Sequence, residues 1–232
     1  MAKTFTKIGK EITIAVKQGG PDVVGNSRLR ALMAEARSEN MPKDNVEKAI
    51  KRALEKNQGD FKEVVFEGYG PHGIAYLVET ATDNNTRTVA NVRSYFTKCG
   101  GSLGTSGSVS FMFDHKCVFR IKYQEGMDLD ELQLALCECD DDPEVFIEEQ
   151  EDKDENITKN VVIYGAYESY GAIQKYIEDN GYELVSGGFE RIPNVDLKDV
   201  TPEQRETLDK LTGLLEDDDD VTNVYSTLKP AE

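Results

Sequence analysis

The chain has 232 residues, of which 38% are hydrophobic and 31% are charged, and its formal net charge is −17. This composition indicates a soluble globular protein with enough apolar material for one large domain or two to three small ones. No run approaches the roughly 20 apolar residues of a transmembrane helix, and no signal peptide is recognisable. We therefore expect a cytoplasmic protein with no membrane partner.

The charge is divided unevenly along the chain. Residues 1–60 carry 12 Lys and Arg against 8 Asp and Glu, a formal +4, whereas residues 61–232 carry 15 against 36, a formal −21. Such asymmetry between segments points to an anionic partner, which most of the chain repels and which can approach only one end. An acidic surface that keeps a protein soluble explains the −21 but not the cationic start.

Residues 1–60 show the apolar spacing of three helices. Gly19-Gly20-Pro21 ends the first helix, because glycine frees the backbone and proline cannot continue the hydrogen-bond ladder. Asn26 or Ser27 can cap the second helix, and Pro42 stands where the first turn of the third helix tolerates proline. The pattern predicts a small three-helix bundle.

Beyond residue 60 the pattern changes to short strands alternating with helices. The closing helix and strand have no strands of their own to pack on, so we expect them to return to the first sheet. The acidic runs at 140–142 and 217–220 are expected to be solvated loops. Strands are expected near residues 63–66, 74–80, 109–113, 117–123, 145–149, 159–164, 182–187 and 223–227, and helices near 89–99, from 128, over 169–180 and from 201.

The expected fold is therefore α+β and multidomain. It consists of an N-terminal three-helix bundle followed by two α+β (ferredoxin-like) domains, one inserted in the other. The expected boundaries are a basic helical domain at 1–60, an α+β domain at 61–125 plus 200–232, and an inserted acidic α+β domain at 126–199.

Catalytic and cofactor motifs find little support. The segment 68–73 has the letters GxGxxG, but Pro71 interrupts it and a β-rich segment follows, which favours a hairpin over a dinucleotide site. His72 and His115 are the two imidazoles, and neither stands in a nucleophile-bearing motif. The four cysteines lack zinc spacing and read as reduced, partly buried thiols. We expect no enzyme activity, no cofactor and no metal.

The glycine-rich segment 100–108 lacks the Gly-Lys-Ser/Thr ending of a phosphate-binding P-loop and runs into a strand. A nucleotide site is therefore improbable there. The segment stays open as a loop that contacts RNA or protein, and a plain flexible connection is equally consistent with its composition.

Basic residues on the predicted helices carry the strongest functional signal. A single lysine is usually a solvated surface charge, but this set stands out against the acidic remainder, and helix starts also favour phosphate. With no Trp, we expect phosphate contacts rather than base stacking. The candidate nucleic-acid-binding residues are Lys3, Lys7, Lys10, Lys17, Arg28, Arg30, Lys43, Lys48, Lys51, Arg52 and Lys56. A second contact is expected from Arg87, Arg93, Ser102, Thr105 and Ser106.

The segments 26–53 and 67–113 resemble the YebC/PmpR family, most specifically at 26–30 (NSRLR), 41–45 (MPKDN) and 67–71 (EGYGP) and over 100–109. Its members are described as probable transcriptional regulators, and it includes the mitochondrial translational activator of cytochrome oxidase subunit I. The resemblance implies a three-domain, crescent-like protein without enzymatic activity and with a role in gene expression. His72 stands where members often have glycine. Members commonly carry a basic, Trp-containing arm before the first helix, whereas this sequence begins at Met1-Ala2-Lys3, so a contact made by such an arm is left open.

Three functions remain open. The first is a transcriptional regulator whose basic helical domain binds DNA, in line with the descriptions of family members. The second is a translation factor that binds ribosomal RNA or the ribosome, as family members that relieve stalling at proline-rich stretches do. The −21 outside residues 1–60 favours the second, because it weakens duplex binding. The third is an adaptor whose acidic α+β surfaces bind protein partners.

Overall fold

The structure is a computed structural model that describes residues 2–55, 60–151 and 157–231. These residues form a mixed α+β fold with seven α-helices and two four-stranded antiparallel sheets, so the predicted fold class is confirmed at that level. The chain divides into two compact units. The first unit comprises Met1–Ile14, Lys51–Asp114 and Arg191–Glu232, and the second comprises Ala15–Ile50 and His115–Glu190.

The N-terminal segment contains three helices, as the sequence predicts. They are α1 (Ala2–Gly19), α2 (Ser27–Ser38) and α3 (Lys43–Leu54). The predicted cap of α2 is confirmed, because the Asn26 side chain accepts the N–H of Leu29 at 3.0 Å. The Asn26 amide also donates to the carbonyl oxygens of Ala15 at 2.8 Å and Gly20 at 2.9 Å. One side chain thus fixes the turn between α1 and α2.

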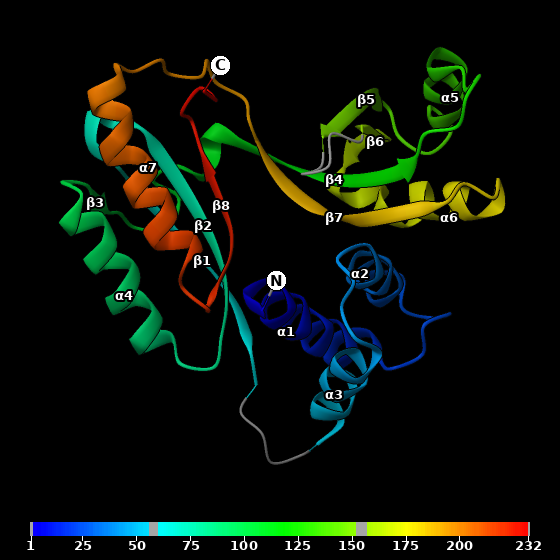
Figure 1. Cartoon of the computed structure of the whole chain (residues 1–232), viewed down its shortest axis with the longest axis horizontal. Coiled ribbons are helices and arrows are strands. Elements are labelled where there is room, and N and C mark those ends of the chain that lie inside the picture. The colour runs from blue at the N-terminus through cyan, green and yellow to red at the C-terminus, as the bar shows by residue number, and fades with distance from the viewer. Residues whose placement is uncertain (1, 56–59, 152–156, 232) are drawn as a thin grey trace. The chain divides into compact units, whose positions relative to one another are not determined.

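In the first unit, the sheet of order β3-β1-β2-β8 carries α4 and α7 on one face (Figure 1). Tyr76 and Phe96 pack edge to face in its core, with ring centroids 5.9 Å apart. β8 pairs antiparallel with β2, so the predicted return of the last strand to the first sheet is confirmed. The elements are β1 (Lys62–Tyr69), β2 (Ala75–Thr82), α4 (Asn85–Lys98), β3 (Ser102–Leu103), α7 (Pro202–Glu216) and β8 (Val221–Ser226).

The turn between β1 and β2 confirms the predicted hairpin. The two strands pair antiparallel up to Tyr69 and Ala75, and a single 3-10 turn, η1 (Pro71–Gly73), joins them. His72 adopts φ 63°, in the left-handed region that glycine enters at least cost. Glycine would adopt this backbone without the steric cost that His72 carries.

The strand predicted at 109–113 is wrong. A 3-10 turn, η2 (Ser110–Met112), occupies most of that segment, and the next strand begins only at Phe113. The backbone N–H groups of Val109 and Ser110 each donate at 2.8 Å to the carboxylate of Glu67, so they are not available to a strand ladder. Burial of Val109 and Phe113 against the face of the first sheet opposite α4 and α7 produced the apolar pattern that the sequence shows.

In the second unit, the sheet of order β5-β6-β4-β7 carries α5 and α6. Phe119, Ile163 and Ile173 are fully buried between sheet and helices, and Ala31 of α2 belongs to the same core. The prediction of a solvated loop at 140–142 is wrong for Asp140, which is buried and accepts the N–H of Ala166 at 2.8 Å. The elements are β4 (Phe113–Lys122), α5 (Leu129–Leu136), β5 (Glu144–Glu151), β6 (Ile157–Ala166), η3 (Tyr167–Ser169), α6 (Tyr170–Asp179) and β7 (Leu184–Pro193).

Candidate nucleic-acid interface

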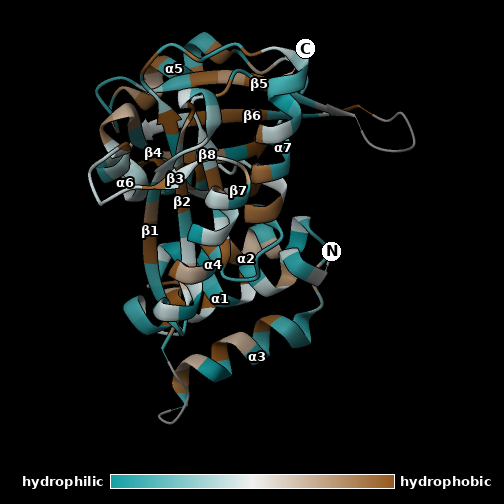
Figure 2. Ribbon diagram, turned by 90° about the vertical axis from the view of Figure 1, so that its left-hand side faces the viewer, coloured by the Kyte–Doolittle hydropathy of each residue, from teal (hydrophilic) through white to brown (hydrophobic). Residues whose placement is uncertain are grey.

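A group of exposed cations lies along α3. Lys48, Lys51 and Arg52 are spaced i, i+3 and i+4, which places them on one face of the helix. In Figure 2 hydrophilic and hydrophobic segments alternate along the α3 ribbon, as expected when one face is polar. Lys43, Lys48 and Lys51 are exposed, and no carboxylate in the described part of the chain lies within ion-pair distance of them. Lys56, the last cation predicted here, lies outside the described residues.

Arg52 is held differently from its lysine neighbours. Its guanidinium carbon lies 4.4 Å from the ring centroid of Phe61, and the ammonium of Lys10 lies 5.3 Å from the same ring. Both distances are within the range of a cation–π attraction. Arg52 is half-buried in consequence, so Lys43, Lys48 and Lys51 are the more accessible cations of α3.

The lysines of α1 make contacts with an acidic turn, residues 216–220, within the first unit. Three of the four predicted binding lysines, Lys3, Lys7 and Lys10, donate to this turn. The contacts are Lys3 Nζ to Asp217 Oδ1 (2.6 Å), Lys7 Nζ to the Glu216 carbonyl oxygen (3.0 Å) and Lys10 Nζ to Asp220 Oδ1 (2.8 Å). The prediction that Asp217–Asp220 is a solvated loop is therefore wrong for Asp220. Lys17 is exposed near the end of α1.

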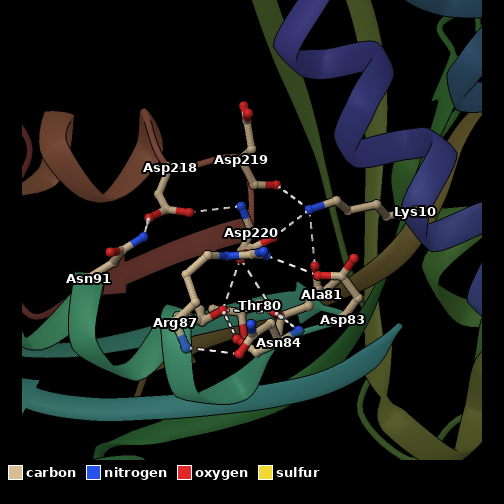
Figure 3. Close-up of polar contacts among 12 residues, drawn as sticks. Lys10, Thr80, Ala81, Asp83, Asn84, Arg87, Asn91, Asp218, Asp219 and Asp220 are labelled. Atoms are coloured by element: carbon tan, nitrogen blue, oxygen red, sulfur yellow. Dashed lines mark hydrogen bonds and ion pairs between the residues drawn. The ribbon is translucent and has the colours of Figure 1, made fainter. Parts of the chain in front are cut away.

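Asp220 is the centre of this contact (Figure 3). Its side chain is 5% exposed and forms ion pairs with Lys10 at 2.8 Å and Arg87 at 2.6 Å. The hydroxyl of Thr88 also donates to it, at 2.9 Å. Burial by itself raises the pKa of Asp220, but these donors outweigh burial and lower it to about 2. The Asp220 carboxylate therefore stays ionised and neutralises cations that were predicted to meet phosphate.

The arginines of α2 are also engaged inside the protein. Arg30 Nε lies 2.5 Å from a carboxylate oxygen of Glu178 on α6, and its Nη1 donates to the carbonyl oxygens of residues 23 and 24. Arg28 donates to the side-chain oxygen of Gln18 at 3.0 Å. Both arginines are half-buried. Arg30 thus links α2 to α6 within the second unit, and a ligand would have to compete with that link.

The residues predicted to form a second nucleic-acid contact also differ in availability: Arg87 is ion-paired within the protein, and the others are exposed. Arg87 is paired with Asp83 at 3.0 Å as well as with Asp220, whereas Arg93 is exposed on α4. Ser102, Thr105 and Ser106 are exposed in the glycine-rich loop.

Glu67, on β1, holds the glycine-rich loop through hydrogen bonds to its backbone. Its buried carboxylate accepts the backbone N–H groups of Gly107 (2.7 Å), Val109 (2.8 Å) and Ser110 (2.8 Å). Burial raises the pKa of Glu67, but the N–H donors outweigh it and the net pKa lies below the ordinary glutamate value. Hydrogen bonds to Glu67 therefore hold the loop at residues 107–110, which differs from a plain flexible connection. Thr105 and Ser106 are exposed to solvent.

Sequence reasoning missed three residues that shape this region, namely Phe61, Glu67 and Asp220. Glu67 belongs to the EGYGP segment, but its partners lie about 40 residues away, so the local pattern gives no sign of its role. Asp220 looked like one member of a solvated acidic run. Its burial depends on the return of β8 to the first sheet, which brings the acidic turn beside α1 and α4.

A metal site and a membrane-spanning helix each place definite requirements on the described residues. Among them no group of three or more His, Cys, Asp or Glu side chains is arranged to hold a metal ion. No helix in the described ranges combines the length and apolar character needed to cross a bilayer. All four cysteines are free thiols, with Cys99 and Cys117 buried.

Comparison with known proteins identifies the family. Residues 1–56 match the model described as TACO1/YebC protein N-terminal domain, and residues 61–228 match the TACO1/YebC second and third domain. A protein of Parabacteroides distasonis named "Probable transcriptional regulatory protein" is 59% identical over 229 residues, covering 99% of this chain and 90% of the relative. A protein of Bacteroides thetaiotaomicron with the same name is 56% identical over 232 residues, covering 100% and 91%.

A solved structure agrees with this assignment. The crystal structure of a conserved hypothetical protein from Aquifex aeolicus superposes with a TM-score of 0.79 at 32% identity, covering 100% of this chain and 91% of the other. The chain has a mixed α+β architecture, with two antiparallel sheets after a cationic helical segment, and its relatives are named as regulators. The chain belongs to the TACO1/YebC family, which confirms the resemblance to YebC/PmpR proteins.

Proposed function

We propose that the chain is a non-enzymatic regulator of gene expression that binds DNA phosphates through the exposed lysines of α3. The observation that carries the proposal is the exposure of Lys43, Lys48 and Lys51, with no carboxylate partner in the described part of the chain. Phosphate neutralisation by such cations supplies sequence-independent affinity through counterion release. Relatives named probable transcriptional regulatory proteins support a role in transcription.

The choice of α3 over α1 follows from the ion pairs. Lys3 and Lys10 would have to exchange carboxylates of the acidic turn for phosphates, whereas the lysines of α3 exchange only water and counterions. The free-energy gain from α1 is accordingly smaller, because an intramolecular anion already neutralises its charge. α3 is therefore the primary contact in this proposal.

Binding to ribosomal RNA or the ribosome is the second candidate, and the charge distribution favours it. Residues 61–232 carry a formal −21, which would repel a long duplex that extends past the helical segment. A folded RNA whose backbone reaches α3 at one place meets less of this repulsion. The protein would then act in translation through the same lysines.

The test is a triple charge reversal, Lys43→Glu, Lys48→Glu and Lys51→Glu. All three side chains are exposed on α3, so the fold should be retained. Loss of three phosphate contacts should reduce the dependence of binding on salt, by about 0.9 in log–log slope per contact for duplex DNA and about 0.7 for a single strand. Fluorescence anisotropy with labelled DNA and with labelled ribosomal RNA fragments measures both affinity and slope.

The matched control reverses Lys98, Lys175 and Lys210, which are exposed on α4, α6 and α7. It changes the net charge equally, so a general electrostatic effect would weaken binding in both variants. Equal binding by the α3 variant and the control would contradict the proposal. Sequencing the nucleic acid retained from lysate, with and without nuclease, decides between the candidates: discrete promoter DNA supports transcription, and ribosomal RNA supports translation.

A further inference from the structure

β5 is an edge strand of the sheet in the second unit. It pairs with β6 along its whole length, from Glu144 opposite Tyr164 to Glu151 opposite Ile157. In the described part of the chain, residues 144–151 make no backbone hydrogen bond to any segment other than β6. One row of backbone N–H and C=O groups of β5 is therefore available for pairing with another strand.

β5 exposes one large apolar side chain on each face of the sheet. Phe146 is 40% exposed and packs beside Tyr164, with ring centroids 5.4 Å apart. Ile147 is 38% exposed on the face that carries α5 and α6, since its pairing partner Val161 lies in that core. Natural edge strands usually avoid such exposure because it invites pairing with another chain.

The charged residues of the segment 138–151 all have the same sign. Residues 138–151 contain eight Asp and Glu and no Lys, Arg or His. Neighbouring cations balance three of the carboxylates. These pairs are Glu144 with Lys116, Glu148 with Arg120 and Glu149 with Lys159. Glu138, Asp141 and Asp142 are exposed in the turn between α5 and β5, with no cation within ion-pair distance in the described part of the chain, and they give the beginning of this edge a net negative charge.

We propose that the β5 edge binds an extended, Lys- or Arg-rich segment of a partner protein, which adds to the sheet as a fifth strand. Backbone pairing supplies affinity in this mode, and side-chain complementarity supplies specificity. A second copy of the chain is a poor occupant, because pairing β5 with itself would place acidic side chains opposite one another. The negative charge thus blocks self-association and selects a basic strand.

The alternation of β5 defines the pattern of that partner strand. Val145 and Ile147 face the helix-covered side, whereas Glu144 and Glu148 face the other side with Phe146. A strand that alternates lysine with valine can therefore place its valines over Ile147 and its lysines over Glu148. This pattern provides a probe of defined chemistry.

The probe is a fluorescently labelled octapeptide of alternating lysine and valine, titrated with the full-length chain at about 0.15 M salt, where long-range attraction is largely screened. Saturable binding is expected. An otherwise identical peptide, N-methylated on the backbone of alternate residues so that one edge cannot donate hydrogen bonds, should bind at least about tenfold more weakly, because several hydrogen bonds are lost at constant charge. Equal affinity of the two peptides, or no binding of the first, would overturn the proposal.

A charge variant locates the binding to β5. Ile147→Lys places a cation on the exposed edge, where lysine is well tolerated, and should abolish peptide binding. Leu134→Lys is the matched control, since Leu134 is 73% exposed on α5 in the same unit, and it should bind like the unmodified chain. The proposal would also be overturned if both variants still bound the peptide, or if only Leu134→Lys failed to bind it.

The other possible occupant of the β5 edge is a second copy of the chain, and sedimentation velocity tests for it. A dimer of the unmodified chain that is absent in Ile147→Lys would show that β5 pairs with a second copy instead. Nucleic-acid binding should be unchanged in Ile147→Lys, so the outcome here is independent of the role of α3.

Discussion

At the scale of single residues, Asp220 shows how one buried carboxylate can set the stability of the first unit. Its pKa of about 2 lies below the value of about 3.9 that an unfolded chain gives aspartate, so ionised Asp220 stabilises the folded state. The stabilisation is complete above about pH 4 and is lost as the pH falls toward 2. Asp220→Asn should therefore lower the free energy of unfolding by about 2 kcal/mol at pH 7 and by progressively less below pH 4.

Denaturant unfolding at pH 7 and at steps below pH 4 measures this difference between the unmodified chain and the variant. Asp219→Asn is the matched control, because Asp219 accepts from Lys10 through its backbone carbonyl oxygen and its side chain is exposed. The control should change stability by less than about 0.5 kcal/mol. A penalty for Asp220→Asn that stays constant between pH 7 and pH 3 would contradict the role assigned to ionised Asp220.

Sequence reasoning reaches a definite limit at this scale. The cap at Asn26 was readable because a capping side chain bonds to a backbone group within three residues. The pairing of Lys10 with Asp220 spans 210 residues, so no local pattern predicts it. The cations of α1 could be assigned to one helical face from their spacing, but what that face contacts depends on the topology of the whole first unit.

At the scale of elements, the glycine-rich loop depends on Glu67. Glu67→Gln keeps the size of the side chain but removes the negative charge and one acceptor oxygen, and hydrogen bonds to charged groups contribute about 1.5–3 kcal/mol each. The amide hydrogens of Gly107, Val109 and Ser110 should then exchange with solvent at least about tenfold faster. Hydrogen exchange measured by NMR checks this at each position.

Glu63→Gln is the control for the loop, because Glu63 lies on the same strand but is exposed. Protection in the loop should be unchanged in that variant. If Glu67→Gln also left the three exchange rates unchanged, the loop would be held by its glycine-rich backbone and not by the carboxylate. The pKa of Glu67 lies below the ordinary glutamate value, so the carboxylate stays ionised and the anchoring should persist at a pH where an ordinary glutamate is already protonated.

The elements themselves were largely predictable, because helices and strands follow the local period of apolar residues. The error at 110–112 has a specific cause. Val109, Phe111 and Phe113 are apolar at every second position, which imitates a strand, but Phe111 is 66% exposed and the backbone donors of Val109 and Ser110 are taken by Glu67. The Glu67 side chain, 42 residues from Val109 and 43 from Ser110, thus decides the local conformation, and only the folded sheet brings it there.

At the scale of the whole molecule, the opposed charges of the two parts should make nucleic-acid binding depend on salt in two regimes. At high salt, counterion release from the lysines of α3 dominates, and log affinity falls linearly with log salt. At about 0.01 M salt the Debye length is about 30 Å, so the −21 of residues 61–232 repels the same polyanion across the molecule. Affinity measured by anisotropy from about 0.01 M to 0.3 M salt should therefore flatten or decline at the low end.

The variant that reverses Lys98, Lys175 and Lys210 makes residues 61–232 more acidic without altering α3, so its flattening should extend to higher salt while its slope at high salt stays the same. The α3 variant should show the opposite effect, with a shallower slope at high salt. A single straight line for the unmodified chain over the whole range would mean that the acidic residues do not oppose binding. In that case the bound polyanion would be short enough to avoid them, and the case for RNA over an extended duplex would lose its electrostatic basis.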